Sequence, residues 1–233
     1  MKIAAIVTDI EGTTSSIGFV HDVLSPYLLS NLGKYIRANK EERDVSRVLG
    51  RLSKTTGIPR HDVNGMIELL ELWTRDEESY PDLKILQGMV LEKAYKQGLF
   101  QAPVYEDVPP VLQLWLEKEL NIYAFSSESV KSQQLFFRFS HMGDLRLLFS
   151  GYFDSQMGEK RSEAAYRNIA QAIALPPERI LYLSDCKEEL DCAKEVGFMT
   201  CWLVRPQDTS LDPERARVKS PHQVVTSFNQ IQL

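Results

Sequence analysis

The chain has 233 residues, of which 43% are hydrophobic and 25% are charged, a balance typical of a soluble globular protein with a large core. Its net charge of −5 argues against a nucleic-acid binder, because phosphate contacts require clustered Lys and Arg. No apolar run approaches the roughly 18–20 residues that span a bilayer, and the N-terminal run is too short for a signal peptide, so no membrane association is expected.

Short, nearly continuous apolar runs predict strands that are buried on both faces. They cover residues 3–7, 122–125, 180–183 and 200–204. Helical patterns accompany the late runs, at residues 129–142, 159–174 and 187–197. Strand and helix alternating in this way predict an α/β protein with a parallel sheet and helices on both faces.

Residues 18–100 have a different pattern. Apolar side chains recur there at helical spacing, as in Val63, Met66, Ile67 and Leu70, and no convincing strand is present. Prolines after residue 102 mark the return to the sheet. We therefore expect a core made of residues 1–17 and 101–233, with residues 18–100 inserted as a helical domain.

Polar residues gather where the predicted parallel strands end, which is the edge of such sheets that binds ligands. They are Asp9 and Glu11 after the first strand, Ser126 and Ser127 after the second, Ser184 and Asp185 after the third, and Lys160 at the expected start of a helix.

These residue types suit a phosphate and a metal ion. Asp9 and Asp185 would repel each other unless a cation lies between them, and a hard divalent ion with oxygen ligands, Mg²⁺, fits beside phosphate. Ser126 and Lys160 would hold phosphate oxygens, together with an anion nest formed by the backbone N–H groups of residues 12–14.

The predicted reaction starts from the phosphate held in this way. Asp9 would attack it and form an aspartyl phosphate. Glu11 would protonate the leaving oxygen and later activate water. Each feature alone has a structural explanation, such as a turn, a helix cap or a solvated lysine. The functional interpretation depends on all of them occurring in this order at equivalent strand ends.

The motif residues Asp9 to Thr13, Ser126, Lys160 and Asp185 resemble the signature elements of the haloacid-dehalogenase-like phosphatases. The resemblance implies a Rossmann-like core with a helical cap after the first strand. Over nearly the whole chain, segments such as DIEGTT, YAFSSESV, GEKRSEAAYRNIA, LYLSDCKEELDCAKEVG and LVRP are similar to the enolase-phosphatases of methionine salvage.

That resemblance implies a small phosphorylated metabolite as substrate, 2,3-diketo-5-methylthiopentyl 1-phosphate, which is enolised and dephosphorylated to an acireductone. It also implies one Mg²⁺ per chain and a monomer. Asp9, Glu11 and Asp185 correspond to the magnesium-associated acids, and Ser126, Ser127 and Lys160 correspond to the phosphate contacts. Thr13 belongs to the opening signature, and Glu189 corresponds to a second, supporting acid.

The chain departs from the superfamily pattern at Glu11, where aspartate is usual, and from the enolase-phosphatase pattern at Glu77, Glu78, Leu91 and Glu128. These departures leave open which cap residues contact the substrate. The cysteines, Cys186, Cys192 and Cys201, form no CxxC pair and indicate reduced thiols in a cytoplasmic protein.

Other functions remain open from the sequence. The nearest is a plain small-metabolite phosphatase of the same superfamily, without the enolase step. A dehalogenase would not need the acid pair Glu11 and Asp185, and a mutase would retain the phosphate. A non-catalytic phosphometabolite-binding module would gain nothing from a nucleophilic carboxylate at Asp9.

Overall fold

The computed structural model describes residues 2–76, 78, 80–206, 208 and 219–233. The chain divides into two compact units. The first is Met1–Phe19 together with Gln101–Leu233, and the second is Val20–Phe100.

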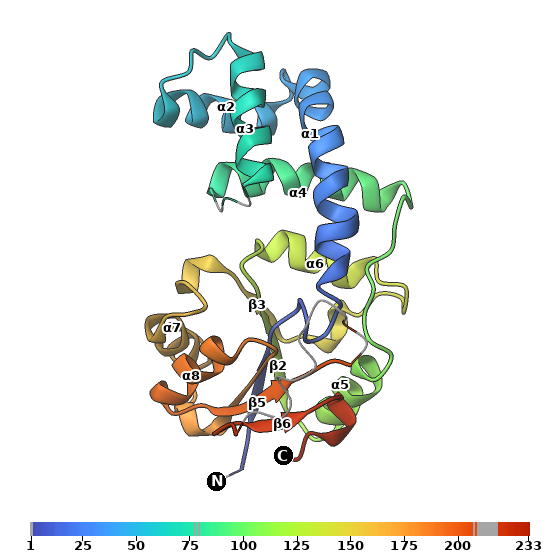
Figure 1. Cartoon of the computed structure of the whole chain (residues 1–233), viewed down its shortest axis with the longest axis vertical. Coiled ribbons are helices and arrows are strands. Elements are labelled where there is room, and N and C mark those ends of the chain that lie inside the picture. The colour runs from blue at the N-terminus through green and yellow to red at the C-terminus, as the bar shows by residue number, and fades with distance from the viewer. Residues whose placement is uncertain (1, 77, 79, 207, 209–218) are drawn as a thin grey trace. The chain divides into compact units, whose positions relative to one another are not determined.

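The first unit is built on a parallel six-stranded sheet in the order β3-β2-β1-β4-β5-β6 (Figure 1). The strands are β1 (Ala5–Thr8), β2 (Asn121–Phe125), β3 (Gly151–Phe153), β4 (Ile180–Ser184), β5 (Met199–Leu203) and β6 (Gln223–Val225). β1 and β4 are buried along their whole length, as expected for unbroken apolar runs in a sheet covered on both faces. The predicted α/β class with a parallel sheet is confirmed.

Helices cover both faces of this sheet. α7 (Glu163–Ile173) and α8 (Lys187–Val196) lie on one face, and α5 (Val108–Glu117) lies on the other (Figure 1). α6 (Val130–Arg138) packs against β3. The core beneath α7 and α8 includes Val7, Tyr166 and Tyr182, and the rings of the two tyrosines meet edge to face, with centroids 5.1 Å apart.

The order of the strands determines where a ligand can bind. The chain adds β2 and β3 on one side of β1 and then adds β4, β5 and β6 on the other. This reversal puts the carboxyl ends of β1 and β4 at the topological switch point, where open α/β sheets bind ligands. Thr8 pairs with both Ala124 of β2 and Leu183 of β4, so the segments that follow these three strands leave the sheet at the same level.

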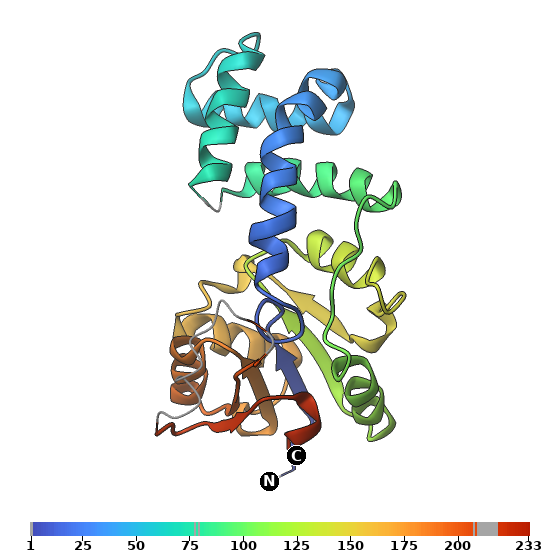
Figure 2. The ribbon, with the colours of Figure 1, turned by 45° about the vertical axis from the view of Figure 1, so that its right-hand side comes forward.

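The second unit is helical. Its α-helices are α1 (Ser25–Asn39), α2 (Arg43–Thr56), α3 (Val63–Arg75) and α4 (Pro81–Lys96), and no strand occurs among its described residues (Figure 2). α1 packs closely on α3 at Gly33, where an added Cβ would lie 2.8 Å from the side chain of Ile67. Only glycine allows this approach, and Leu32 and Ile36 of α1 and Leu70 of α3 are fully buried.

Three details differ from the expectations. The helical patterns are longer than the helices, so that α6 ends at Arg138 rather than at residue 142. Lys160 is not at a helix start, because α7 begins at Glu163 after Ser162, whose side chain accepts the backbone N–H of Ala164. The edge strands β3 and β6 were not predicted.

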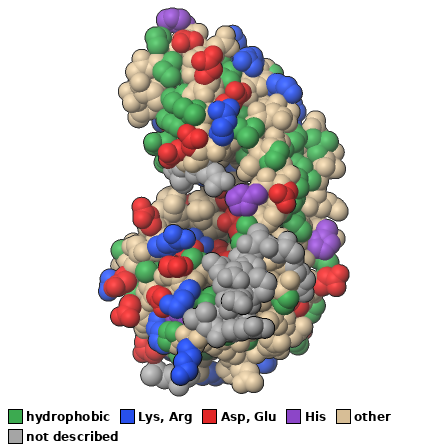
Figure 3. Space-filling view, viewed as in Figure 1, with side chains coloured by type: hydrophobic (Ala, Val, Ile, Leu, Met, Phe, Trp, Pro, Cys, Tyr) green, Lys and Arg blue, Asp and Glu red, His purple; other side chains and the backbone are tan. Residues whose placement is uncertain are grey.

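None of the helices in the described part of the chain is both long and apolar enough to cross a membrane. On the face shown in Figure 3, Lys and Arg side chains are interspersed with Asp and Glu rather than gathered into one basic patch.

Candidate active site

Asp9 lies directly after β1, at the switch point of the sheet. Its backbone N–H donates to the Leu183 carbonyl of β4 at 2.8 Å, which ties the start of the loop to the neighbouring strand. The residue is 3% exposed, and its carboxylate accepts two side-chain hydrogen bonds. Lys160 Nζ donates to Oδ1 at 2.5 Å, and Thr13 Oγ1 donates to Oδ2 at 3.2 Å.

Lys160 lies between two acids. Its Nζ is 2.5 Å from Asp9 Oδ1 and 3.1 Å from Glu189 Oε2. Its own carbonyl accepts a 2.6 Å hydrogen bond from the Tyr166 hydroxyl, which fixes the turn before α7. Burial by itself lowers the pKa of Lys160, but the two carboxylates outweigh burial and raise it, so the ammonium stays charged at neutral pH.

The pKa of Asp9 is raised above its ordinary value of 3.8. Burial is the main cause, the Lys160 ammonium opposes it, and the Glu189 carboxylate adds to it. A raised pKa at a strand end beside a fixed cation is typical of functional sites, although structural ion pairs also produce it.

Glu189 is held from the sheet side. Its Oε2 accepts hydrogen bonds from the Tyr182 hydroxyl at 2.7 Å and from Ser184 Oγ at 2.9 Å. Both donors are on β4, and Glu189 is in the first turn of α8. The carboxylate is therefore fixed by a rigid strand and in turn positions the ammonium of Lys160.

Thr13 joins the loop after β1 to the loop after β4. Its hydroxyl donates to Asp9 and accepts the backbone N–H of Asp185 at 3.0 Å. Gly12, with φ of +73°, lies against Asp185, and a Cβ at Gly12 would come within 2.6 Å of the carboxyl carbon of Asp185. Trp202 Nε1 donates to the Asp185 carbonyl at 2.7 Å and holds this loop from β5.

The expected anion nest is wrong for residues 12–14. The backbone N–H of Gly12 donates to the Ser15 carbonyl, and those of Thr13 and Thr14 donate to the Ile10 carbonyl. These groups close a tight turn after β1, so they do not converge on a ligand. The turn instead directs side chains, notably the hydroxyl of Thr13.

The other predicted residues lie at the same strand ends. Ser126 is buried after β2, and its hydroxyl oxygen accepts the backbone N–H of Glu128 at 3.1 Å. Ser127 is exposed beside it. Glu11 is half-buried, and its backbone forms an isolated β-bridge with Ser15. Direct contacts therefore join Asp9, Thr13, Lys160, Asp185 and Glu189, while Glu11 and the two serines flank them.

The donor set fits a magnesium ion rather than a metal held entirely by side chains. Among the described residues, no group of three or more His, Cys, Asp or Glu is arranged to bind a metal. Mg²⁺ usually takes one or two carboxylates and keeps several waters. Asp9 and Asp185 could supply two such carboxylates, and the lack of a Cβ at Gly12 lets the Asp185 carboxyl group approach the loop that carries Asp9.

The departures from the family pattern have varied surroundings. Leu91 is buried in α4, and Glu78 is exposed. The backbone N–H of Glu128 donates to the Ser126 hydroxyl oxygen. Glu77 lies outside the described residues.

Sequence reasoning gave no role to several residues that support this site. Tyr182 and Ser184 hold Glu189, and Arg205 holds the carbonyl of Thr13. The Tyr182 hydroxyl within a buried apolar run was a usable signal, because such a group requires a partner. Arg205 donates to a backbone carbonyl, a group that every residue has, so no pattern of residue types could have indicated this hydrogen bond.

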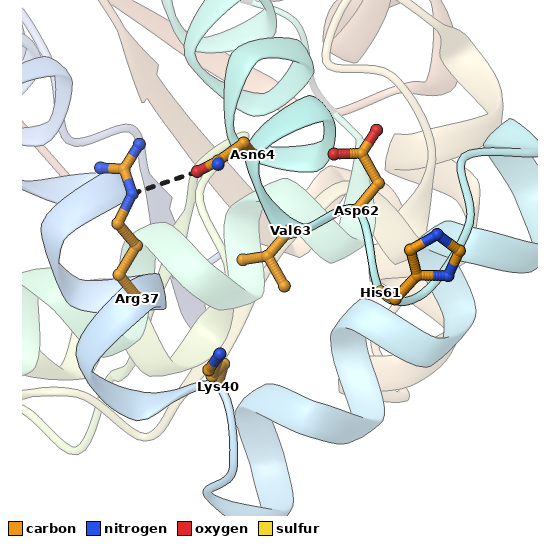
Figure 4. Close-up of a pocket in the computed structure, with 6 residues that line it drawn as sticks. All are labelled: Arg37, Lys40, His61, Asp62, Val63 and Asn64. Atoms are coloured by element: carbon orange, nitrogen blue, oxygen red, sulfur yellow. Dashed lines mark hydrogen bonds between the residues drawn. The ribbon is translucent and has the colours of Figure 1, made fainter.

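A separate polar pocket of about 360 Å³ lies within the helical unit (Figure 4). It is lined by the residues Arg37, Lys40, His61, Asp62, Val63 and Asn64. Arg37 Nε donates to Asn64 Oδ1 at 3.3 Å, and Asp62 caps α3 by accepting the Gly65 N–H. The helix N-terminus in this pocket is therefore already capped by a carboxylate, and none of the predicted site residues lines the pocket.

Comparison with known proteins gives the family. The chain is 42% identical over 231 residues to enolase-phosphatase E1 of Pectobacterium atrosepticum, covering 99% of this chain and 97% of that protein. It is 44% identical over 229 residues to enolase-phosphatase E1 of Erwinia tasmaniensis, with 98% and 96% covered. The chain belongs to the enolase-phosphatase E1 family. Members of this family are phosphatases, so the chain is an enzyme of that class.

Solved structures share the fold of this chain. The UTR4 protein of Saccharomyces cerevisiae superimposes with a TM-score of 0.80 at 28% identity, covering 99% of this chain and all of that one. CbbY of Rhodobacter sphaeroides, solved with phosphate, gives a TM-score of 0.60 at 14% identity, covering 98% of this chain and 96% of that one, and shares the fold alone. No protein-family model matches the sequence.

Proposed function

We propose that this enzyme converts 2,3-diketo-5-methylthiopentyl 1-phosphate to the acireductone 1,2-dihydroxy-3-keto-5-methylthiopentene and phosphate, in methionine salvage. Family membership supports the two-step activity. The observation that carries the proposal is the buried Asp9 carboxylate at the end of β1, held between the Lys160 ammonium and the Thr13 hydroxyl. Fixing both carboxylate oxygens preorganises the group for attack on a phosphorus atom.

In the proposed reaction, Asp9 attacks the phosphorus and the bond from phosphorus to the substrate oxygen breaks. Glu11 gives its proton to the departing oxygen. Water then attacks the phosphorus of the aspartyl phosphate, Glu11 takes the water proton, and the Asp9 carboxylate leaves with phosphate released. Glu11 returns to its protonated form, and the atoms balance.

The other residues bind and orient. Ser126, whose hydroxyl oxygen accepts from Glu128, can donate its hydroxyl hydrogen to a phosphate oxygen, and the exposed Ser127 can add a second donor. Lys160 neutralises part of the charge of Asp9 and of the phosphate, and Glu189 keeps its ammonium in place. Asp9 and Asp185 would hold Mg²⁺, with Glu11 beside it, and the ion would supply charge stabilisation for the transferring phosphoryl group.

The remaining expectations belong to this proposal. One Mg²⁺ is bound per chain, the enzyme is a cytoplasmic monomer, and the helical unit acts as a cap that carries substrate selectivity. Light scattering on the purified protein measures the oligomeric state.

The test measures both steps separately. The purified protein is given the diketo phosphate and a panel of other phosphorylated metabolites, with Mg²⁺ or with excess chelator. Enol formation is followed by absorbance and phosphate by a coupled assay. We expect both steps with the diketo phosphate, and phosphate release only with Mg²⁺.

Asp9→Asn is the matched variant, since asparagine has nearly the same shape but cannot form the acyl phosphate. Steady-state phosphate release by the folded Asp9→Asn protein would contradict the nucleophile assignment. Phosphate release without any enol formation would identify a plain phosphatase instead.

A further inference from the structure

Arg205 is a buried cation behind the candidate active site. It follows β5 and is 2% exposed. Its guanidinium carbon lies 4.3 Å from the ring centroid of Tyr105 and 5.1 Å from that of Phe228. A buried guanidinium is stable only when its charge is paired and its donors are satisfied.

The donors of Arg205 are divided between two partners. Nη1 donates to both carboxylate oxygens of Asp107, at 2.9 and 2.7 Å. Nε and Nη2 both donate to the carbonyl oxygen of Thr13, at 3.0 and 2.8 Å. The ion pair with Asp107 satisfies the charge, and the two remaining bonds converge on a single backbone atom of the loop after β1.

Thr13, whose carbonyl Arg205 holds, contacts two acidic residues of the site, Asp9 and Asp185. The Thr13 hydroxyl donates to Asp9 Oδ2 and accepts the backbone N–H of Asp185. The carbonyl and the hydroxyl of Thr13 belong to one fully buried residue. A shift of its carbonyl therefore moves the hydroxyl that orients Asp9.

The surroundings of Arg205 make its position rigid. Asp107 also accepts the backbone N–H of Phe228 at 2.6 Å, and the Tyr105 N–H donates to the Thr14 carbonyl at 3.0 Å. The guanidinium is thus fixed by two segments that are far apart in the chain, residues 105–107 and Phe228. All of these residues belong to the same compact unit.

We propose that Arg205 is a positioning residue for the nucleophile: through the Thr13 carbonyl it fixes the hydroxyl that orients Asp9 and the loop that carries Asp185. This role rests on the proposed function, in which Asp9 is the attacking group. Arg205 acts through Thr13 and is not itself a catalytic residue.

A purely structural role makes a different prediction. If Arg205 only stabilised the fold, its replacement would lower the melting temperature but leave the folded enzyme at full speed. If it positions Asp9, the folded variant turns over slowly. Arg205→Lys separates these cases, because lysine keeps the charge but has no planar fork to serve Asp107 and Thr13 together.

The experiment compares Arg205→Lys with two other variants. Asp107→Asn weakens the ion pair that holds the Arg205 guanidinium but keeps the two hydrogen bonds to Thr13. It should therefore disturb the site less than Arg205→Lys does. Arg179→Lys is the control, because Arg179 is exposed before β4, at the opposite end of the sheet, and its Nε also donates to a backbone carbonyl, that of Lys2, at 3.4 Å.

Two quantities are measured at a temperature well below every melting point. One is kcat and KM for phosphate release from p-nitrophenyl phosphate with Mg²⁺. The other is the hydrogen-exchange rate of the Asp185 amide relative to that of Ile6 in β1. A misplacement of 1 Å can cost about 100-fold in rate, so we expect a smaller loss of about tenfold in kcat for Arg205→Lys with little change in KM.

We expect faster exchange at Asp185 in Arg205→Lys, a smaller change in the same direction in Asp107→Asn, and wild-type behaviour in Arg179→Lys. Wild-type kcat and exchange in folded Arg205→Lys would overturn the proposal. If that variant does not fold, the same result in Asp107→Asn overturns it. Absence of phosphate release by the wild-type protein contradicts the proposed function, and the exchange rates then still decide whether Arg205 holds the loop.

Discussion

Lys160→Met tests whether one ammonium holds the two buried carboxylates of the site. Methionine keeps the length of the apolar stem of lysine but removes the terminal ammonium and its charge. The Lys160 Nζ lies 2.5 Å from Asp9 and 3.1 Å from Glu189, and the exposed fractions of the three side chains are 14%, 4% and 11%. The variant therefore leaves two nearly buried carboxylates without the cation that they share.

The magnitude follows from these distances. At an effective dielectric constant of about 20, each contact has a gross Coulomb energy of roughly 5–7 kcal/mol, and most of it is offset by the desolvation of the charges. Removing one partner of a buried ion pair costs about 3–5 kcal/mol, because the other charge stays buried. We expect a loss of that size in the free energy of unfolding at pH 7.5.

The loss should shrink at lower pH. Burial already raises the pKa of Asp9 above that of an unfolded chain, and removal of the Lys160 ammonium raises it further. As the pH falls, the Asp9 carboxyl group therefore takes up a proton in the folded variant before it does so in the unfolded chain. Its stability relative to wild type therefore recovers as the pH falls from about 7 to 5.

Urea unfolding in excess chelator, followed by circular dichroism, measures both quantities. Lys96→Met is the matched control, because the Lys96–Glu92 pair is 2.9 Å long but its side chains are 58% and 26% exposed. Exposed pairs contribute less than about 1 kcal/mol. A loss below about 1 kcal/mol for Lys160→Met at pH 7.5, or one that does not shrink toward pH 5, would refute the reasoning.

Further predictions concern the acids Asp185 and Glu11 and the buried histidine His222. Asp185→Ala should abolish the Mg²⁺ dependence of phosphate release or the release itself, measured by titrating Mg²⁺ into the chelated enzyme; an unchanged titration would contradict the metal assignment. Glu11→Gln should slow phosphate release about 10²–10⁴-fold, the usual range for general acid–base catalysis. If Glu11 serves both steps, Glu11→Asp should keep more phosphatase than enolase activity, because aspartate is one methylene shorter; intact enolisation with lost dephosphorylation would reverse this. Burial lowers the pKa of His222, whose ring nitrogens contact Thr200 at 2.7 Å and Asp191 at 3.0 Å. The unfolded chain therefore binds a proton first, so stability is lost as the pH falls below about 6.5, and His222→Gln should weaken this dependence in urea unfolding.

The central strands could be predicted from the sequence because strands buried on both faces consist of unbroken apolar runs. The edge strands could not. Gly151–Phe153 and Gln223–Val225 have three residues each and are only partly buried, so they show neither a continuous run nor an alternation. Their pairing to β2 and β5 is a consequence of the tertiary fold.

The candidate site was predictable to the extent that strand ends meet at one edge. This rule brought Asp9, Lys160 and Asp185 to the same place from positions far apart in the chain. It did not give the backbone hydrogen bonds. The N–H groups of residues 12–14 were expected to face a ligand, but the tight turn uses them internally, because a short loop between a buried strand and a buried turn must satisfy its own backbone.

The charge balance of the site explains why its supports are so extensive. Three acidic residues, Asp9, Asp185 and Glu189, are buried around the switch point, and Lys160 contacts two of them. Repulsion among these groups favours structures in which they move apart or take up protons. The contacts that oppose this come from the sheet, through Tyr182 and Ser184 to Glu189 and through Trp202 to the Asp185 loop.

The fold therefore holds negative charge in a place where the isolated residues would not remain together. Such an arrangement gains its stability elsewhere, from the fully buried strands β1 and β4 and the helices packed on them. In the proposed function, a cation and a phosphate would enter together, because the cation would relieve the repulsion that the phosphate would otherwise increase. In the proposed function, the support that the strands give to these acids would serve the binding of a metal ion together with a phosphorylated substrate.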